Sequence, residues 1–183
     1  MSRITRDDWI EEGLRVLADE GDGALTVDGL CERLGRTKGS FYHHFAGRTQ
    51  FVTALLEAWQ RRATDRLIET GRGRGTVEER LRAVNQQASE LRNAALERAI
   101  RGWGAREPLA ARAQDRVDAR RLAFLEDLCA ERMGRGDAAR HLARVLQLVF
   151  IGAQHLEPPL EGAELYRTFR SLDPLFDVED RDE

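Results

Sequence analysis

Several residue types are scarce in this 183-residue chain, and each scarcity narrows what the protein can be. The two cysteines, Cys31 and Cys129, are too few and too far apart for a disulfide framework or a zinc site. The longest apolar stretches, such as Leu148 to Ile151, are far shorter than the roughly 20 residues of a membrane-spanning helix. The N-terminus lacks the basic flank and unbroken apolar stretch of a signal peptide. We therefore expect a cytoplasmic protein with no membrane segment.

Lysine occurs once, as Lys38, among 29 basic residues, and acidic residues are missing from Arg33 to Leu56. The whole chain nevertheless carries a net charge of −3 and has a pI of about 5.9. One segment of an acidic protein is therefore locally basic, as a nucleic-acid-binding surface would be.

The chain is predicted to be all α, because its four prolines lie at the edges of apolar segments and no run alternates with the two-residue period of a strand. Thr5, Thr26 and Thr37 are placed to cap the first three helices, and Gly35 to end the second one in a left-handed conformation. Longer helices are expected over about 48–70, 76–103 with a break near 91–93, 108–133 and 138–156. A short one is expected within 161–172.

Two short helices joined by a turn of about three residues with a glycine have the geometry of a helix-turn-helix. A rotation of about 100° per residue puts Phe41 and Phe45 on one side of the second helix. Gly39, Ser40 and His43 then lie on the opposite side. This outer face is small and polar at its centre, which suits a helix that enters a DNA major groove.

The hydrogen-bonding groups around that face divide into base and phosphate contacts. Gly39 allows close approach, Ser40 and His43 can touch base edges, and Lys38 can reach a guanine or a phosphate. Phosphate contacts are expected from Tyr42, His44 and the clamp that Arg48 forms with nearby backbone amides. Arg36 in the turn reaches either a base or a phosphate. The full set of DNA-binding candidates is Thr26, Arg36, Thr37, Lys38, Gly39, Ser40, Tyr42, His43, His44 and Arg48.

The segment from Trp9 to Leu56 resembles the DNA-binding domain of TetR-family regulators. After the turn, that family has glycine, an apolar residue, a hydroxyl, any residue, glycine, two variable positions, tyrosine, any residue, histidine and phenylalanine. This chain has Gly35, Arg36, Thr37, Lys38, Gly39, Ser40, Phe41, Tyr42, His43, His44 and Phe45 there. Arg36 departs from the usual small apolar residue, and Arg48 and Phe51 replace the commoner lysine and leucine.

The resemblance implies a three-helix helix-turn-helix DNA-binding domain at residues 1–47 and a larger helical ligand-binding and dimerisation domain at residues 48–183. It also implies a homodimer that binds a palindromic DNA operator as a repressor until an unknown small-molecule effector binds. The expected protein has no cofactor and is not an enzyme.

The body of the chain offers candidates for the effector site and for the dimer seam. Aromatic and polar side chains that fit a largely apolar pocket are Trp59, Gln86, Trp103, Phe124 and Phe150. The same aromatic residues fit an ordinary core equally well. Apolar and small residues at helical spacing, which the resemblance places at a four-helix seam across a two-fold axis, are Val117, Phe124, Leu128, Leu142, Val145, Leu146, Val149 and Gly152.

Other interpretations of the chain predict different chemistry. A metal site at the His43-His44 pair would need further ligands, and no Cys or carboxylate lies close in sequence. A redox-sensor role for Cys31 or Cys129 competes with packing as a small apolar side chain. No nucleophile motif or phosphate-binding glycine loop is present to support an enzyme. The main alternative keeps the DNA-binding or protein-interaction module and removes the small-molecule effector.

Overall fold

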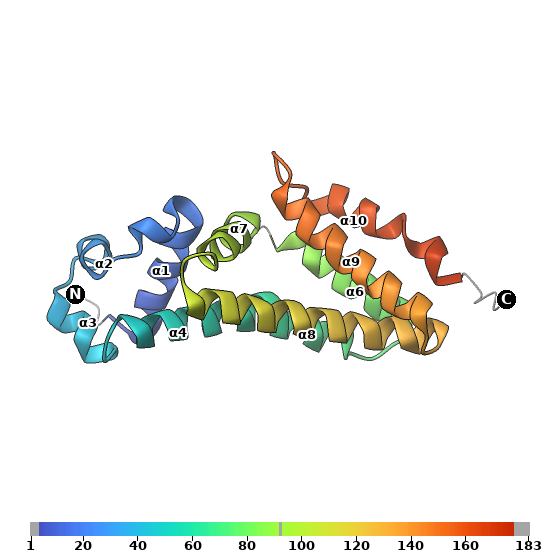
Figure 1. The fold of residues 1–183 in the computed structure, drawn as a ribbon, viewed down its shortest axis with the longest axis horizontal. Helices are drawn as coiled ribbons and strands as arrows, with labels where there is room; N and C mark the ends of the chain where they lie inside the picture. Colours follow the sequence, from blue (N-terminus) through green and yellow to red (C-terminus); the bar gives the residue numbers. More distant parts are fainter. Residues whose placement is uncertain (1–3, 92, 178–183) are drawn as a thin grey trace. The chain divides into compact units, whose positions relative to one another are not determined.

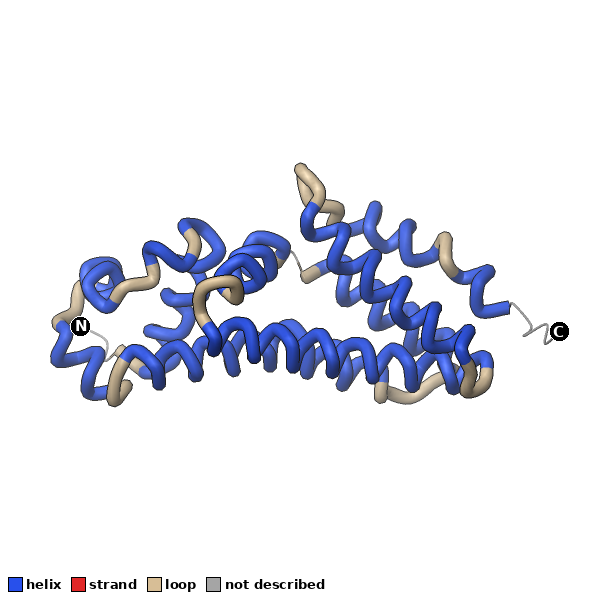
Figure 2. The backbone as a smooth tube through the Cα atoms, in the orientation of Figure 1, coloured by secondary structure: helices blue, strands red, loops and turns tan. Residues whose placement is uncertain are grey.

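The structure is a computed structural model that describes residues 4–91 and 93–177. Within those ranges the backbone forms helices and connecting loops and no strand (Figure 2). The predicted all-α class, with a helix-turn-helix near the N-terminus and a larger helical body, is confirmed. No helix of the described part is both long and apolar enough to cross a membrane.

The helices follow one another along the chain as Figure 1 labels them. The first half contains α1 (Arg6–Glu20), a 3-10 turn (Asp22–Ala24), α2 (Val27–Leu34), α3 (Lys38–His44), α4 (Arg48–Gln60), a π turn (Arg61–Asp65) and α5 (Arg66–Gly71). The second half contains α6 (Val77–Glu90), α7 (Ala94–Trp103), α8 (Pro108–Met133), α9 (Asp137–His155), α10 (Gly162–Arg170) and a 3-10 turn (Asp173–Asp177).

Threonine hydroxyls cap the helices where the sequence predicts caps. Thr5, Thr26 and Thr37 each accept a hydrogen bond from the backbone N–H three residues later. Each bond satisfies one of the amides that a helix start leaves without a partner. The apolar pattern missed the π turn, which buries two consecutive side chains, Ala63 and Thr64. It divides the single helix predicted over 48–70.

Contacts between Cα atoms group the chain into two compact units. Unit 1 contains residues 1–62 and 95–115, and unit 2 contains residues 63–94 and 116–183. Unit 1 thus includes α7 and the start of α8 besides the helix-turn-helix. The domain boundary predicted between residues 47 and 48 divides the chain elsewhere and stays a prediction.

Aromatic rings form the core of unit 1 around Phe41, which is fully buried. The Phe41 ring centroid lies 5.4 Å from those of Trp9 and Phe51 and 5.2 Å from that of Phe45. Such edge-to-face and tilted pairs add roughly 0.5–1.5 kcal/mol each beyond the area they bury. Because Phe41 comes from α3, the same cluster that stabilises unit 1 also holds α3 in place.

Apolar side chains from α8, α9 and α10 form the core of unit 2. Cys129 on α8 is fully buried among Leu142 and Leu146 of α9 and Leu165 of α10. At the end of α5, a Cβ atom on Gly71 would clash with Cζ of Phe124, so α5 packs closely against α8.

Candidate nucleic-acid interface

The turn before α3 is fixed by its backbone conformation. Gly35 ends α2 with φ 62° and ψ 43°, a left-handed conformation that glycine adopts without a Cβ clash. The N–H of Arg36 then donates to the Cys31 carbonyl at 2.8 Å, and Thr37 caps α3. Phe41 and Phe45 leave α3 on its buried side. This local structure decides which side chains of α3 face outward.

The outward side of α3 carries the residues predicted for DNA. Lys38, Gly39, Tyr42 and His43 are exposed, with 55% of Tyr42 accessible, and Ser40 and His44 are half-buried. Thr37 is also exposed but uses its hydroxyl as a cap, as Thr26 does at α2. Arg36 is half-buried in the turn. The contact of these residues with DNA stays a prediction.

Two acidic residues that the sequence analysis did not single out pair with the predicted cations. Nζ of Lys38 lies 2.8 Å from Oδ1 of Asp28 on α2, and this hydrogen bond raises the pKa of Lys38. Asp28 lies ten residues before Lys38 and on a different helix, so helical spacing in the sequence does not predict this contact.

The second cation, Arg48, pairs with a carboxylate far along the chain. Nη1 of Arg48 donates to Oε2 of Glu107 at 3.0 Å, and this hydrogen bond lowers the pKa of Glu107. Glu107 precedes α8 and lies in unit 1, as Arg48 does. Its second oxygen accepts from the N–H of Leu109 at 3.3 Å. Arg48 and Glu107 are 59 positions apart, and no pattern in the sequence predicts their contact. The predicted phosphate clamp at Arg48 therefore has a competing anion in the free protein.

Unit 2 contains an apolar cavity of about 50 Å³. Its walls come from the π turn, α5, α6, α8, α9 and α10, and its lining residues are Thr64, Leu67, Ile68, Val84, Asn85, Ala88, Arg121, Phe124, Leu125, Leu146, Gln147, Phe150 and Phe169. Phe124 and Phe150 are thus two of the five predicted effector residues that the structure brings together.

Polar groups reach this apolar cavity from three helices. Arg121 is buried, donates through Nε to Oγ1 of Thr64 at 3.1 Å, and lies over the Phe150 ring at 5.3 Å. Gln147 donates to the Asp118 carbonyl at 3.1 Å, while its Oε1 is buried without a hydrogen-bond partner. Asn85, only 7% exposed, completes the set. An unpaired buried acceptor is costly, so Gln147 offers a place for a donor from a bound molecule.

The other three predicted effector residues lie outside the cavity. Trp59 is buried in unit 1, where its indole N–H donates to Oε1 of Glu97 at 2.9 Å. Trp103 is also buried in unit 1, and Gln86 is exposed on α6, where it hydrogen-bonds Glu90. We assign the two tryptophans to the core of unit 1, because helical apolar spacing alone cannot separate a core face from a cavity face.

The residues predicted for a dimer seam divide by exposure. Val117, Leu128, Leu142 and Leu146 are buried inside the subunit, and Phe124 lines the cavity. We therefore assign the four buried residues to the interior of unit 2, whereas Phe124 is half-buried. Val149 is half-buried, whereas Val145 is 36% exposed and Gly152 faces open space.

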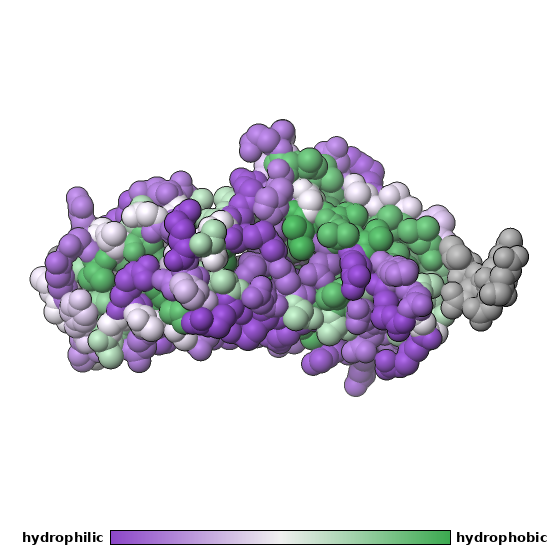
Figure 3. All heavy atoms as spheres, in the orientation of Figure 1, coloured by the Kyte–Doolittle hydropathy of each residue, from purple (hydrophilic) through white to green (hydrophobic). Residues whose placement is uncertain are grey.

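Leu148, which the prediction left out, and Leu156, which directly follows α9, extend an exposed apolar face of this helix. Leu148 is 61% and Leu156 is 53% exposed. We call Val145, Leu148, Gly152 and Leu156 the α9 stripe, because they recur at three- and four-residue steps and share one helix face. Figure 3 shows hydrophobic residues gathered over the region of α9 and α10.

Comparisons with known proteins match the N-terminal segment and the fold. A family model described as bacterial regulatory proteins of the tetR family matches residues 10–55. The transcriptional regulator AcuR of Cereibacter sphaeroides is 34% identical over 56 residues. That alignment covers 31% of this chain and only 26% of the relative's length.

Solved structures resemble the chain over nearly its whole length. The reduced form of NemR from Escherichia coli superposes with a TM-score of 0.75 at 20% identity, and the match covers 94% of this chain and 97% of that one. A protein from Saccharomonospora viridis described as a transcriptional regulator, solved in complex with choline, gives a TM-score of 0.73 at 15% identity, with 91% and 94% covered. At these identities the likeness concerns the fold.

Proposed function

We propose that this chain is a TetR-family regulator that represses transcription as a homodimer, binds a palindromic operator and is released by a small molecule, because residues 10–55 match the tetR family model. The observation that carries the DNA-binding step is the division of α3 into two sides. Phe41 and Phe45 hold its inner side in an aromatic core, while its outer side presents Gly39, Ser40 and Tyr42.

The start of α4 supports a phosphate contact beside α3. Gly47 precedes α4 and makes no side-chain cap, so the first amides of α4 are open to an anion. Arg48 stands at that start and is about half exposed. In the complex we expect a phosphate to replace Glu107 as its partner. Lys38 would exchange Asp28 for a base or phosphate in the same way.

The α9 stripe supports a homodimer. Three large apolar side chains on one helix face cost free energy when they contact water, and a second copy of the same face buries them about a two-fold axis. Two copies of α3 would then contact half-sites whose centres lie about 34–36 Å apart, or a multiple of one DNA turn.

The apolar cavity supports an effector site in unit 2. It provides apolar walls, a buried guanidinium and an unpaired amide oxygen, as ligand sites commonly do. The S. viridis relative is described in complex with choline, so a protein of this fold holds a small molecule. Release of DNA requires only that the effector prefer the DNA-incompetent state, with a coupling of about 1–3 kcal/mol.

Selection of binding sites from a random DNA duplex pool at a stated salt concentration tests the DNA-binding and dimer steps. We expect a palindrome with half-sites about one helical turn apart. No enrichment would contradict DNA reading by α3 and favour a protein-interaction module. Enrichment of a single, unrepeated half-site would contradict binding as a dimer but would still support DNA recognition by α3.

A further inference from the structure

A second, polar pocket lies beside the apolar cavity in unit 2. It measures about 200 Å³, and its lining residues are Glu78, Leu81, Arg82, Asn85, Arg132, Arg170, Asp173 and Phe176. These come from α6, α8, α10 and the 3-10 turn after α10. Asn85 also lines the apolar cavity, so the two spaces lie on either side of one amide. We call the polar space the arginine pocket.

The lining residues of the arginine pocket include three guanidinium groups and two carboxylates. Nε of Arg132 lies 2.6 Å from Oε1 of Glu78, and Nη1 of Arg170 lies 2.5 Å from Oδ2 of Asp173. Arg82 on α6 brings a third guanidinium with no third carboxylate among the lining residues. Guanidinium groups bind carboxylates through paired hydrogen bonds. An added anion would restore the balance of charge.

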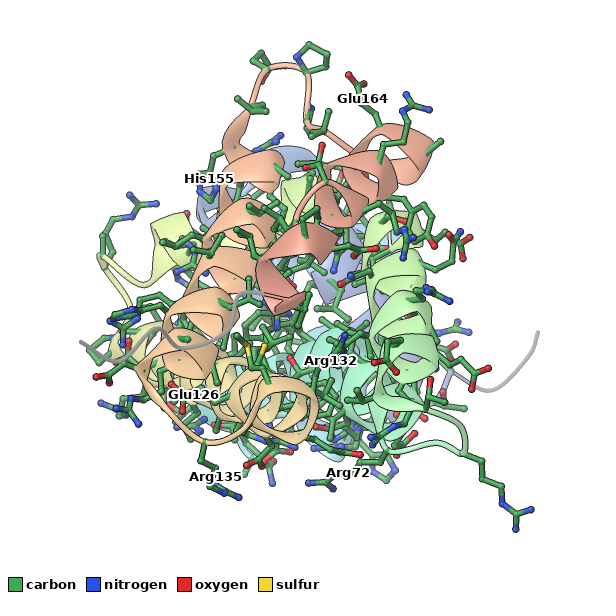
Figure 4. The ribbon with its side chains drawn as sticks, turned by 90° about the vertical axis from the view of Figure 1, so that its right-hand side faces the viewer. Arg72, Glu126, Arg132, Arg135, His155 and Glu164 are labelled. Atoms are coloured by element: carbon green, nitrogen blue, oxygen red, sulfur yellow. The ribbon has the colours of Figure 1, made fainter. Side chains whose placement is uncertain are left out.

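Arg132 is the lining residue that α8 contributes to this pocket. Figure 4 shows Arg132 on the side of α8 that faces α6 and α10, whereas Arg135, in the loop after α8, points outward. The Arg135 side chain is 86% exposed, and its Nη2 lies 3.9 Å from Oδ1 of Asp127. It therefore offers a matched arginine outside the arginine pocket.

The size of the apolar cavity limits the apolar part of a bound molecule. A water-sized group needs roughly 10–15 Å³ of such space. A cavity of about 50 Å³ therefore accepts roughly four groups of methylene size without rearrangement. A molecule that occupies both spaces has a short apolar body and a charged end next to Asn85.

We propose that unit 2 binds a small amphiphilic carboxylate, with its apolar body in the cavity lined by Phe124 and Phe150 and its carboxylate in the arginine pocket. The inference deepens the effector step of the proposed function and rests on it. Asn85, buried between the two spaces, donates its amide to the carboxylate. Arg132 exchanges part of its contact with Glu78 for contact with the ligand, and Arg82 adds a second guanidinium.

Calorimetric titration of the full chain with sodium pentanoate and with 1-pentanol tests this inference. The two probes share a chain length and differ in charge. We expect saturable binding of pentanoate with a Kd at least tenfold lower than that of pentanol, and thermal stabilisation that saturates at the same concentrations. Sodium chloride at equal ionic strength should not reproduce either result.

Variants connect the binding to the arginine pocket. Arg132→Gln and, because it is exposed and safer for folding, Arg82→Gln should each raise the Kd for pentanoate at least fivefold and leave pentanol unchanged. Arg135→Gln should change neither Kd. Equal affinity for acid and alcohol, or equal loss in Arg135→Gln, would overturn the carboxylate site.

Two further outcomes separate this inference from the proposed function. If neither probe binds up to its solubility limit, the inference fails, whereas release of the selected operator by another molecule would leave the proposed function standing. If pentanoate binds through Arg82 and Arg132 but leaves operator affinity unchanged, the inference holds, and release of DNA by this site is contradicted.

Discussion

Gly39 leaves bare backbone on the outer side of α3, and the free protein does not need a glycine there. A Cβ atom at this position would meet only Oγ1 of Thr37, at an ordinary 3.6 Å. The Gly39→Ala variant should therefore fold as well as the wild type or gain up to about 1 kcal/mol in unfolding free energy. Its operator affinity should fall about tenfold or more, because DNA needs the space. Urea unfolding and fluorescence anisotropy measure the two effects.

Gly23 provides the control for this substitution. A Cβ atom at Gly23 would meet no heavy atom of the described residues within 4 Å, and this glycine lies in the 3-10 turn before α2. Gly23→Ala should leave operator affinity unchanged. Equal affinity of Gly39→Ala and wild type would show that α3 does not approach DNA closely at this residue.

Cys129 is a packing residue rather than a reactive thiol. It is fully buried, and burial raises its pKa to about 12. At pH 8 roughly one molecule in 10,000 then carries the thiolate. Ellman's reagent should react with Cys129 only on the timescale of unfolding, and denaturant should release both cysteines at once. Rapid modification of Cys129 in the native protein would restore the redox-sensor interpretation.

Rotation by 100° per residue correctly predicted the buried and exposed sides of α3, because Phe41 and Phe45 leave the helix one turn apart. The anions that neutralise Lys38 and Arg48 could not be predicted. Asp28 reaches Lys38 across a turn, and Glu107 reaches Arg48 only after the chain has folded. Helical periodicity describes contacts within one helix, whereas each of these ion pairs joins residues from two different segments of the chain.

The ion pair at the start of α4 links DNA affinity to the segment before α8. We expect Arg48→Gln to reduce the slope of log affinity against log salt by about 0.9, the value for one phosphate contact. Glu107→Gln should raise affinity up to about fivefold, because a partly exposed ion pair contributes about 0–1 kcal/mol. Anisotropy titrations across a salt series measure both. An unchanged slope in Arg48→Gln would contradict the phosphate clamp.

The same pair gives a pH dependence with a defined sign. The hydrogen bond from Arg48 lowers the pKa of Glu107 from its ordinary 4.5. Such a carboxyl contributes stability above its unfolded pKa and loses that contribution as pH falls through the folded pKa. The difference in unfolding free energy between wild type and Glu107→Gln should therefore be constant near neutral pH and disappear on acidification below the folded value. A difference that persists at pH values well below the folded pKa would contradict this ion pair.

Most helix bounds could be predicted, because caps and breakers are local. Thr37, Gly35 and Pro108 each mark a helix end by their own backbone or side-chain chemistry. The π turn could not be predicted, because Trp59, Ala63 and Leu67 follow one another at the four-residue spacing of a regular helix. Its place in the cavity wall became visible only in three dimensions.

At the scale of the whole molecule, the α9 stripe is the proposed contact between two subunits. Leu148→Glu places a charge at the most exposed position of the stripe and should convert the dimer to a monomer at micromolar concentration. Analytical ultracentrifugation measures the mass. Leu175→Glu is the matched control, since Leu175 is 43% exposed in the 3-10 turn after α10.

Operator binding should weaken together with dimerisation in Leu148→Glu, because two half-sites bound by one dimer give more affinity than two separate monomers. A wild type that sediments as a monomer, or a Leu148→Glu variant that remains dimeric, would contradict this use of the stripe.

Apolar spacing in the sequence identified the helices that form the interior. It could not tell which apolar face packs into a core and which lines a cavity. Trp59 and Phe150 have the same apolar signature, yet one belongs to the core of unit 1 and the other lines a cavity in unit 2. The difference depends on neighbours contributed by other helices. Only packing reveals where the space between those neighbours remains unfilled.

The single lysine, Lys38, allows selective chemical labelling of one side chain. All other side-chain cations that titrate above neutral pH are arginines, so an amine-directed acylating reagent has one side-chain target, and 61% of that side chain is accessible on α3. A dye or acetyl group attached there would report directly from the proposed DNA surface. Bound operator would shield this amine from the reagent, so the labelling rate of Lys38 would report the fraction of protein bound to DNA.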